Sequence, residues 1–567
     1  MGSTTTYDYA IVGGGLAGCV LASRLREYDG NAKIVLLEAG DDTRERHDVQ
    51  NPQVLNLGGD MDWQYQSEPT PGCMNRVITF NSGKGLGGGS AINSGREKEC
   101  ENELNGFNFA TKGGWTRGAA VDYDEWARLV GDERYSYRGQ LPWFKKAEHW
   151  FDETNPEQHG KDGPIHVASA GSTGRTFPLS GNAAAAWEEQ GVHELPGADQ
   201  NAGNNIGRAY ICEARRDGKR QWSASLYPLE GVEVRLRTLV NRVLTEKIDG
   251  EITATGVELS DGSVLSAKNT ILSAGTFRSP QLLQLSGIGA AAHLKEVGIK
   301  PLVDLPEVGR GLTDHLSFFQ HWRLKDPSAG YTLGSPNPVF AEPQYSHGVP
   351  MDWIVCTSVP KDGLIEAIGE DEGREPDKSH PLLAKPRTFL ENIVLYAKVP
   401  FPGVPMDTEH MTTAVVGFLP TSRGSVSLKS AKAEDHPKIE LNYLSTEVDK
   451  YVMRQGLRGL TKFMLGSGFS RHIAGETVPE SLPAQPLSLE DDDNKLNQRL
   501  AMTSGTTWHA SGTCSMGKVV DTEFRVRGVK GLRVVDASVL PVPLSAHIQA
   551  PLYAMAEQAA AIISGKS

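Results

Sequence analysis

Residues 7–40 read YDYAIVGGGLAGCVLASRLREYDGNAKIVLLEAG, and this stretch decides the fold. Its apolar start predicts a strand, its glycines a tight turn, its amphipathic middle a helix, and residues 33–40 a second strand. In the pattern Gly-x-Gly-x-x-Gly, the first glycine permits the turn, the second lets the backbone approach a pyrophosphate, and the third lets helix and strand pack closely. The stretch predicts a βαβ unit that holds a dinucleotide at the helix N-terminus, with these candidate contacts: Gly13, Gly15, Leu16, Ala17 and Gly18.

Glu38 lies at the end of the second predicted strand, twenty residues after Gly18. A carboxylate at this place accepts hydrogen bonds from ribose hydroxyls and repels a 2′-phosphate. Glu38 and its neighbour Ala39 are therefore candidate ribose contacts, and a phosphorylated nicotinamide ligand is disfavoured.

The composition is that of a globular protein of several domains, with 567 residues, 39% of them hydrophobic and 22% charged. A net charge of −13 argues against a nucleic-acid or anionic-membrane partner, and no apolar stretch has the length of a membrane-spanning helix.

The six cysteines form neither a CxxC pair nor a metal-like cluster, so we expect reduced thiols and no metal. The first predicted strand begins at Tyr7 and leaves no room for a secretion signal, which predicts a cytoplasmic location. Nothing in the sequence indicates an oligomeric state.

Three further segments carry a family resemblance. Residues 83–93 read GKGLGGGSAIN, residues 275–289 read GTFRSPQLLQLSGIG, and residues 507–517 read TWHASGTCSMG. Together with residues 525–564, they make the chain resemble the glucose–methanol–choline (GMC) family of FAD-dependent oxidoreductases, from about residue 7 to residue 564. The resemblance implies FAD as cofactor and an α/β fold. It consists of a Rossmann-type FAD-binding domain and an α+β second domain, whose β-sheet forms a floor over the flavin ring.

The resemblance also implies a discontinuous organisation. We expect the FAD-binding domain in residues 1–315, the substrate-binding domain in residues 316–500, and a return to the FAD domain in residues 501–567. The family's C-terminal part begins at about residue 420. Residues 326–410 are rich in proline and glycine and show little periodicity, so we expect them to form the pocket roof and access channel.

A polar run interrupts the family's first signature. The signature is met by Gly83, Gly87, Ser90 and Asn93, which the resemblance places against FAD. Its aromatic position falls on Glu97, but removal of the 18 residues 96–113 brings Trp115 to that position. A surface loop and a translated intron both account for the run. Loops near chemistry seldom split a cofactor-contacting motif, which favours the intron. In either case no function is assigned to the residues of the run.

Two histidines are the candidate catalytic residues. Histidine suits a base that takes a hydroxyl proton, because its ordinary pKa lies near operating pH. His509 matches the family's catalytic histidine and is expected to be the general base. His547 matches the second active-site position, where it would hydrogen-bond the substrate oxygen and hold it for hydride transfer to flavin N5. The helix predicted after His547, with Pro551 near its first turn, would place its positive end, with Ile548 and Gln549, against the flavin pyrimidine ring.

Other positions are assigned by the resemblance alone. Asp536 and Ala537 belong to the segment that returns to the pyrophosphate, and Val240 matches a position beside the adenine. Ile92 stands where some members carry a histidine bound covalently to FAD, so FAD is expected to be non-covalent here. Asp314 and His315 are interpreted as shaping the domain junction without a catalytic role.

The sequence therefore predicts FAD-dependent oxidation of a primary aryl or allylic-type alcohol, inside the cell and in secondary metabolism. The partners are a small-molecule alcohol and an electron acceptor, either O2 or another molecule. Two alternatives stay open at this point. One is lyase or cyclase chemistry on the same FAD scaffold, and the other is a product made inactive by the run at 96–113.

Overall fold

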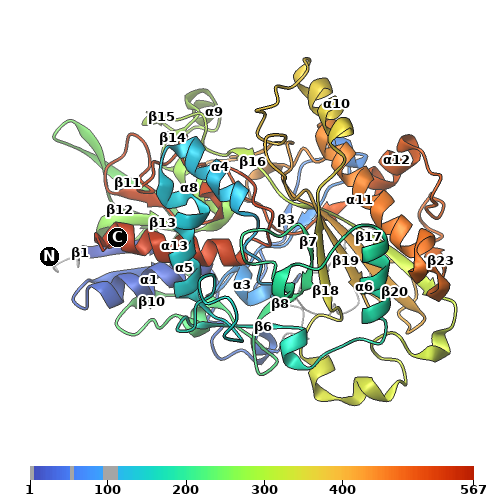
Figure 1. Ribbon diagram of the computed structural model, residues 1–567. Helices are drawn as coiled ribbons and strands as arrows, with labels where there is room; N and C mark the ends of the chain where they lie inside the picture. The colour runs from blue at the N-terminus through green and yellow to red at the C-terminus, as the bar shows by residue number, and fades with distance from the viewer. Residues whose placement is uncertain (1–5, 52–56, 94–112, 567) are drawn as a thin grey trace.

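A computed structural model describes residues 6–51, 57–93 and 113–566 of the chain. Two seven-stranded sheets lie side by side, one on the left and one on the right in Figure 1, and both chain ends lie beside the left-hand sheet. Each sheet has its own buried apolar core. The α/β architecture predicted from the sequence is confirmed.

The first sheet grows from the glycine-turn unit. β1 (Thr6–Val12) lies between β2 (Ile34–Leu37) and β13 (Val264–Leu272), parallel to both, with α1 (Leu16–Tyr28) as the crossover from β1 to β2. The sheet is completed by β10 (Glu233–Arg235), β11 (Val240–Ile248), β12 (Glu251–Leu259) and β25 (Leu532–Val534). β12 and β13 form the hairpin predicted at Asp261 and Gly262. α1 packs against α13 (Gln549–Ser564), and α13 packs against α5 (Tyr137–Ala147), so helices from both ends of the chain cover the sheet.

The second sheet is antiparallel and has the strand order β23, β17, β20, β19, β18, β7, with β24 beside β17. The strands are β7 (Gly207–Tyr210), β17 (Leu316–Leu324), β18 (Trp353–Thr357), β19 (Leu390–Leu395), β20 (His410–Gly417), β23 (Ile473–Thr477) and β24 (Gly505–Thr506). α11 (Glu447–Gly466) packs on β19 and β20, flanked by α10 (Lys361–Glu372) and α12 (Asp493–Thr503). The opposite face of this sheet looks toward the first sheet.

Shorter elements join the two halves. The remaining helices are α2 (His47–Gln50), α3 (Gly89–Ile92), α4 (Ala120–Val130), α6 (Ser180–Glu189), α7 (Ser223–Leu226), α8 (Gly275–Leu285) and α9 (Ala291–Glu296). The remaining strands are β3 (Tyr65–Gln66), β4 (Thr79–Phe80), β5 (Glu148–His149), β6 (Ile165–Ser169), β8 (Cys212–Arg216), β9 (Lys219–Arg220), β14 (Ile288–Gly289), β15 (Val303–Asp304), β16 (Arg310–Leu312), β21 (Gly424–Ser427) and β22 (Lys438–Glu440).

The expectation for residues 326–410 needs correction. This region is not only roof and channel, because β18 and β19 lie inside it and pair within the second sheet. All six residues of β19, LENIVL, are buried. A strand buried on both faces carries no polar–apolar alternation, so its periodicity is invisible in the sequence.

The predicted division at residues 315 and 500 stays a prediction. Two strands cross it: β7 comes from the range expected for the first domain, and β24 comes from the range expected to return to it, yet both join the second sheet.

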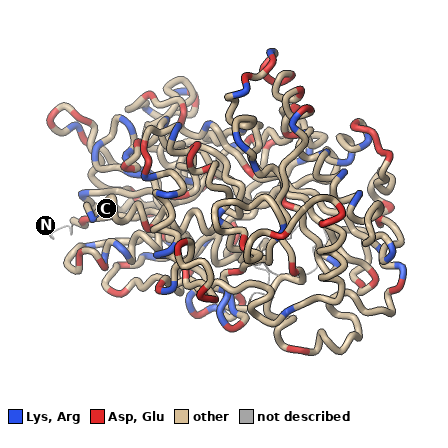
Figure 2. The backbone as a smooth tube through the Cα atoms, in the orientation of Figure 1, with Lys and Arg blue, Asp and Glu red and all other residues tan. Residues whose placement is uncertain are grey.

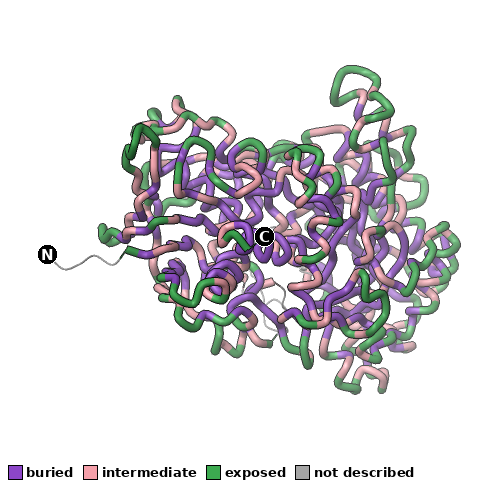
Figure 3. The backbone as a smooth tube through the Cα atoms, turned by 60° about the vertical axis from the view of Figure 1, so that its left-hand side comes forward, coloured by how far each residue is buried: buried purple, intermediate pink, exposed green. Residues whose placement is uncertain are grey.

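Buried residues fill the interior of both halves, and exposed residues follow the outer loops (Figure 3). Acidic and basic side chains of both signs are interleaved around the periphery (Figure 2). No described helix is both long and apolar enough to cross a membrane.

Candidate active site

A cavity lies where the two glycine-rich loops, the start of α8 and the inner face of the second sheet meet. Sixteen of the nineteen predicted site residues line it: Gly13, Gly15, Leu16, Ala17, Glu38, Ala39, Gly83, Ser90, Asn93, Val240, His509, Asp536, Ala537, His547, Ile548 and Gln549. These positions lie far apart in the sequence, and the fold brings them to one wall.

Three predicted site residues lie behind that wall. A Cβ on Gly18 would lie 1.9 Å from the Gly13 carbonyl oxygen, so Gly18 serves the close helix–strand packing that its spacing predicts. Gly87 has φ +88° and lies against the Trp222 side chain. Trp115 is fully buried and its Nε1 donates to Glu148 Oε2 at 2.9 Å, while its neighbour Gly114 reaches the cavity. The run at 96–113, apart from Gly113, lies outside the described residues.

The two glycine-rich loops touch each other. A Cβ on Gly88 would lie 2.8 Å from the Gly15 Cα, so only glycine lets the backbones approach this closely. Gly15 and Gly88 are also the residues that precede α1 and α3, and neither helix start has a side-chain cap within the described part of the chain. The backbone amides of these helix starts can therefore bind phosphate oxygens.

Glu38 is held in place by backbone amides. Its Oε2 accepts from Gly14 N and its Oε1 from Gly40 N, both at 2.8 Å. Burial raises the pKa of the Glu38 carboxyl above its ordinary value, and these two hydrogen bonds act in the opposite direction. Its side chain lines the cavity beside the first glycine loop, which suits contact with a ribose.

The donor and acceptor groups of the wall fit FAD. Asn93 Nδ2 donates to Gln549 Oε1, whereas Asn93 Oδ1 and Gln549 Nε2 are buried with no hydrogen-bond partner among the described residues. Asn93 Oδ1 and Gln549 Nε2 therefore offer one acceptor and one donor to the polar edge of a cofactor ring at the start of α13. That start has no side-chain cap in the described chain. Ile92 lines the cavity as well, and an aliphatic side chain cannot form a covalent link to FAD.

The second sheet supplies an apolar floor. Along β17, Ser317 and Phe319 line the cavity, while the intervening Phe318 faces Arg499 of α12. The paired strands contribute Ile393, Ala414 and Val416 at matching register positions. The sheet floor implied by the resemblance is thus present.

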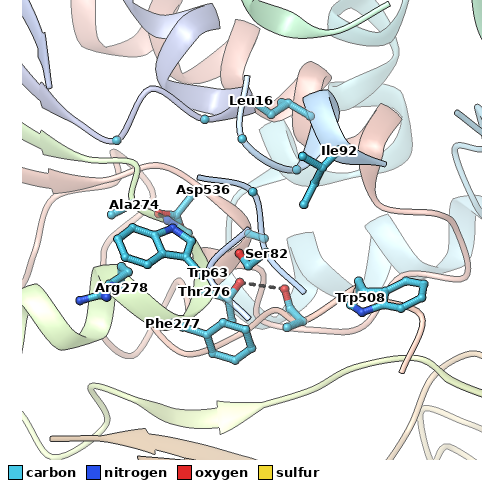
Figure 4. Close-up of a pocket in the computed structure, with 18 of the residues that line it drawn as sticks. Leu16, Trp63, Ser82, Ile92, Ala274, Thr276, Phe277, Arg278, Trp508 and Asp536 are labelled. Carbon is cyan, nitrogen blue, oxygen red and sulfur yellow. Dashed lines mark hydrogen bonds between the residues drawn. The ribbon is translucent and has the colours of Figure 1, made fainter. Parts of the chain in front are cut away.

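Aromatic side chains enclose the same region. Phe80, Phe277 and Trp508 line it, and Phe80 and Phe277 meet edge to face with ring centres 4.9 Å apart. Figure 4 shows Phe277 below Thr276, whose Oγ1 donates to the Ala510 carbonyl at 2.7 Å, and Trp508 on the other side of the opening. Trp63 lies against Arg278 in the same view, with the guanidinium 4.2 Å from the ring centre.

His509 and His547 meet at the wall. Their rings are edge to face with centres 4.9 Å apart. His509 precedes the loop that returns to the first sheet, and His547 precedes α13, so the two rings come from separate segments of the C-terminal region. The pair predicted from the sequence is therefore brought together.

Asp314 and His315 both contact His509. Asp314 Oδ1 accepts from the His509 backbone N–H at 2.8 Å, and its Oδ2 accepts from Thr506 Oγ1 at 2.5 Å and from the Tyr443 hydroxyl. His315 Nδ1 lies 3.0 Å from His509 Nδ1. Both residues thus contact the catalytic candidate His509 directly, and their part in the domain junction stays a prediction.

Glu391 is a site residue that sequence reasoning missed. Its carboxylate, on β19, lies 2.9 Å and 3.1 Å from His547 Nε2. It is 1% exposed, so this is a buried contact. No motif surrounds Glu391, and the pairing of β19 with β20 brings it to His547. The sequence did offer a signal for His315, because an aspartate–histidine pair directly precedes β17, which contributes to the floor.

Burial dominates the protonation of these histidines. It holds the pKa of His509 well below its ordinary value, with His547 and His315 lowering it further. Burial also lowers the pKa of His315 to about 3. Both rings are therefore neutral at physiological pH. Within the described residues no group of His, Cys, Asp or Glu side chains could hold a metal ion, and the five described cysteines are buried and unbridged.

Comparison with known proteins gives a consistent result. Residues 108–317 and 420–556 match the two profiles described as GMC oxidoreductase, and residues 11–60 match an NAD(P)-binding Rossmann-like domain. The GMC-type oxidoreductase acuG of Aspergillus aculeatus is 36% identical over 98% of both chains. An oxygen-dependent choline dehydrogenase of Burkholderia vietnamiensis is 31% identical, over 100% of this chain and 94% of its own. Among solved structures, a variant of the formate oxidase of Aspergillus oryzae, studied for FAD modification, has a TM-score of 0.82 at 25% identity, over 100% of this chain and 99% of its own.

Proposed function

The chain belongs to the GMC oxidoreductase family, and from that premise we propose that it oxidises a primary aryl or allylic-type alcohol to the aldehyde. The family makes it an FAD-dependent oxidoreductase that acts on CH–OH donors. The observation that carries the proposal is the His509–His547 pair, held 4.9 Å apart between the apolar floor and the start of α13.

FAD, when bound along the glycine loops, would supply the hydride acceptor. The protein's own task is then to bind the alcohol, remove its hydroxyl proton and keep water away. His509 is neutral and so can accept a proton. Its Nδ1 already contacts His315 and Thr507, which leaves Nε2 for the substrate hydroxyl.

His547 would hold the substrate oxygen. Its backbone N–H donates to Thr116 Oγ1 at 2.7 Å, and Glu391 fixes the Nε2 edge of its ring. A ring anchored at both backbone and side chain keeps the oxygen in one orientation, which favours hydride transfer. The uncapped start of α13 would favour negative charge developing nearby.

The substrate class follows from the lining. Phe80, Phe277, Phe319 and Trp508 give aromatic surface to the cavity that His509 and His547 line, and Ile393 and Val416 add aliphatic surface. Such a lining favours a flat apolar group next to the alcohol carbon. This supports an aryl or allylic alcohol over a sugar. The acceptor is O2 or another small molecule, and a role in secondary metabolism is part of the proposal.

The test is anaerobic mixing of the purified protein with primary aryl, allylic and saturated aliphatic alcohols, followed by the visible flavin spectrum. We expect bleaching with aryl or allylic alcohols, formation of the aldehyde, and little bleaching with the aliphatic series. Product formed while the flavin stays oxidised would replace the proposal with lyase or cyclase chemistry. A protein that binds no flavin would identify an inactive product.

A further inference from the structure

His509 Nδ1 has two close polar neighbours. His315 Nδ1 lies at 3.0 Å and Thr507 Oγ1 at 3.1 Å. A neutral imidazole carries its single proton on one nitrogen only, and the groups that face each nitrogen decide which one. What these two neighbours can donate therefore determines whether Nε2 of His509 is a base.

Thr507 can only accept from His509. Its hydroxyl proton is in a hydrogen bond to the His315 carbonyl oxygen at 2.8 Å. A hydroxyl has one proton to donate, so the lone pairs of Oγ1 are what it presents to the ring.

His315 also presents an acceptor. Burial keeps its ring neutral, with a pKa of about 3, and a hydrogen bond to the Leu544 backbone acts in the opposite direction. A backbone contact that raises a histidine pKa is a ring N–H donating to a carbonyl. Since Nδ1 faces His509, the nitrogen that donates to Leu544 is Nε2. Assigning the Leu544 contact to Nε2 places the single proton of His315 there and leaves a lone pair on Nδ1.

We propose that His315 and Thr507 are positioning residues that hold His509 in its Nδ1–H tautomer, so that the Nε2 lone pair faces the substrate hydroxyl. The inference rests on the proposed function of His509 as the base. In the step it serves, the alcohol O–H bond breaks, its electron pair stays on oxygen, and the proton forms a new bond to Nε2. The imidazolium that results still donates Nδ1–H to the same two acceptors, which stabilises it.

The other charged and titratable groups around His509 do not compete for Nδ1. Asp314 accepts from the His509 backbone N–H and not from its ring. His547 meets the ring edge to face, and Glu391 lies beyond His547 at its Nε2.

Matched substitutions separate the acceptor from the bulk of each side chain. His315→Asn puts a carbonyl oxygen where Nδ1 stands and keeps the acceptor, whereas His315→Gln puts the amide carbon there, which accepts no hydrogen bond, and keeps an amide near Leu544. Thr507→Ser keeps the hydroxyl, and Thr507→Val removes it at nearly constant volume. The pair His315→Gln with Thr507→Val removes both acceptors, and the pair His315→Asn with Thr507→Ser keeps both.

The experiment is 15N NMR of the holoenzyme labelled at histidine, with the His509 signals assigned by their loss in His509→Asn, together with the pH dependence of anaerobic flavin reduction. In the wild-type protein we expect His509 to carry its proton on Nδ1. The His315→Gln, Thr507→Val protein should show the other tautomer or a mixture. Its reduction rate at saturating alcohol should be about 10²-fold lower, with little change in KM. Its acidic limb should also move to lower pH, because the imidazolium has lost its acceptors.

The His315→Asn, Thr507→Ser protein should retain the wild-type tautomer and pH profile. A wild-type His509 protonated on Nε2 would overturn the inference, whether or not any variant folds. So would a wild-type tautomer and rate in the protein that lacks both acceptors. Failure of every alcohol to bleach the flavin would instead count against the proposed function, because the NMR result does not depend on turnover.

Discussion

At the scale of single residues, burial sets the chemistry of the histidine pair. An exposed histidine titrates near pH 6.5 and would be half protonated, and therefore half inactive as a base, at that pH. Burial lowers the pKa of His509 well below this value, and His547 and His315 add to the effect. His509 is therefore in its unprotonated form over the whole physiological pH range, but the lowered pKa also makes it a weaker base.

The pH dependence of alcohol oxidation follows from this shift. The active form of His509 is neutral, and its pKa is lowered, so activity is lost only as the pH falls below the lowered pKa. We expect kcat/KM to show no acidic limb near pH 6.5. Measurement of kcat/KM from pH 5 to pH 8 checks this, with flavin absorbance recorded at each pH to exclude cofactor loss. An acidic limb centred near 6.5 would show that His509 is solvated or is not the base.

Glu391 is the second residue-scale prediction. Its carboxylate accepts from the His547 Nε2–H and so fixes the orientation of the His547 ring. Glu391→Gln replaces the carboxylate with an amide that can turn its N–H toward the same nitrogen, and the ring loses its fixed orientation. We expect flavin reduction to slow by about 10-fold or more, with FAD retained.

The control for Glu391→Gln is Glu409→Gln. Glu409 is partly exposed and pairs with the exposed Arg323. The same change in charge at Glu409 should therefore leave the rate of flavin reduction unchanged. Equal rates in wild-type and Glu391→Gln proteins would assign Glu391 to packing alone.

At the scale of elements, the glycines of the first turn have separable roles. Gly18 packs on the Gly13 carbonyl, where an added Cβ would lie 1.9 Å from the oxygen. A Cβ on Gly15 would meet protein atoms only at 3.8 Å or more, yet Gly15 lines the cavity. Gly18 thus serves the fold, and Gly15 serves the ligand.

Alanine substitutions should show this difference. Gly18→Ala should lower the free energy of unfolding by about 1–3 kcal/mol, because backbone must move. Gly15→Ala should cost less than about 1 kcal/mol but weaken FAD binding, because the methyl group stands in the phosphate cradle. Denaturation of the FAD-free proteins and FAD titration measure the two effects. Equal loss of stability in both variants would contradict the separation.

Sequence reasoning succeeded where backbone chemistry fixes the spacing. The turn glycines, Glu38 and the hairpin at Asp261 were readable because each conformation demands particular residues at short range. Glu391 was not readable, since its role depends on the register of β19 against β20, set by contacts between segments far apart in the chain. His315 could have been read in part, but its contact with His509 spans 194 positions and needs the fold.

At the scale of the whole molecule, the site exists because the two sheets share it. The first sheet and its helices present the glycine loops and α13, and the second presents an apolar floor through Ser317, Phe319 and Val416. Strand β24 links the halves, since it pairs with β17 and leads directly into the segment that carries His509. A chain that docks the two sheets together therefore places base, floor and cofactor groove in one step.

The run at 96–113 interrupts a segment that contributes to the shared site, so its removal tests whether FAD binding depends on the continuity of that segment. Both flanks are anchored: Asn93 donates to Gln549 at the cavity, and Trp115 N, behind the cavity wall, donates to the Cys212 carbonyl at 2.7 Å. Since the run splits the signature between these anchors, we expect the chain without residues 96–113 to bind a full complement of FAD and the 567-residue chain to bind less. The visible spectra of the two purified proteins, normalised to protein concentration, decide this, and thermal unfolding confirms that both are folded. Full flavin in both would establish the run as a tolerated surface loop, because long insertions cost little closure entropy. Full flavin in the longer chain alone would make the run part of the cofactor site.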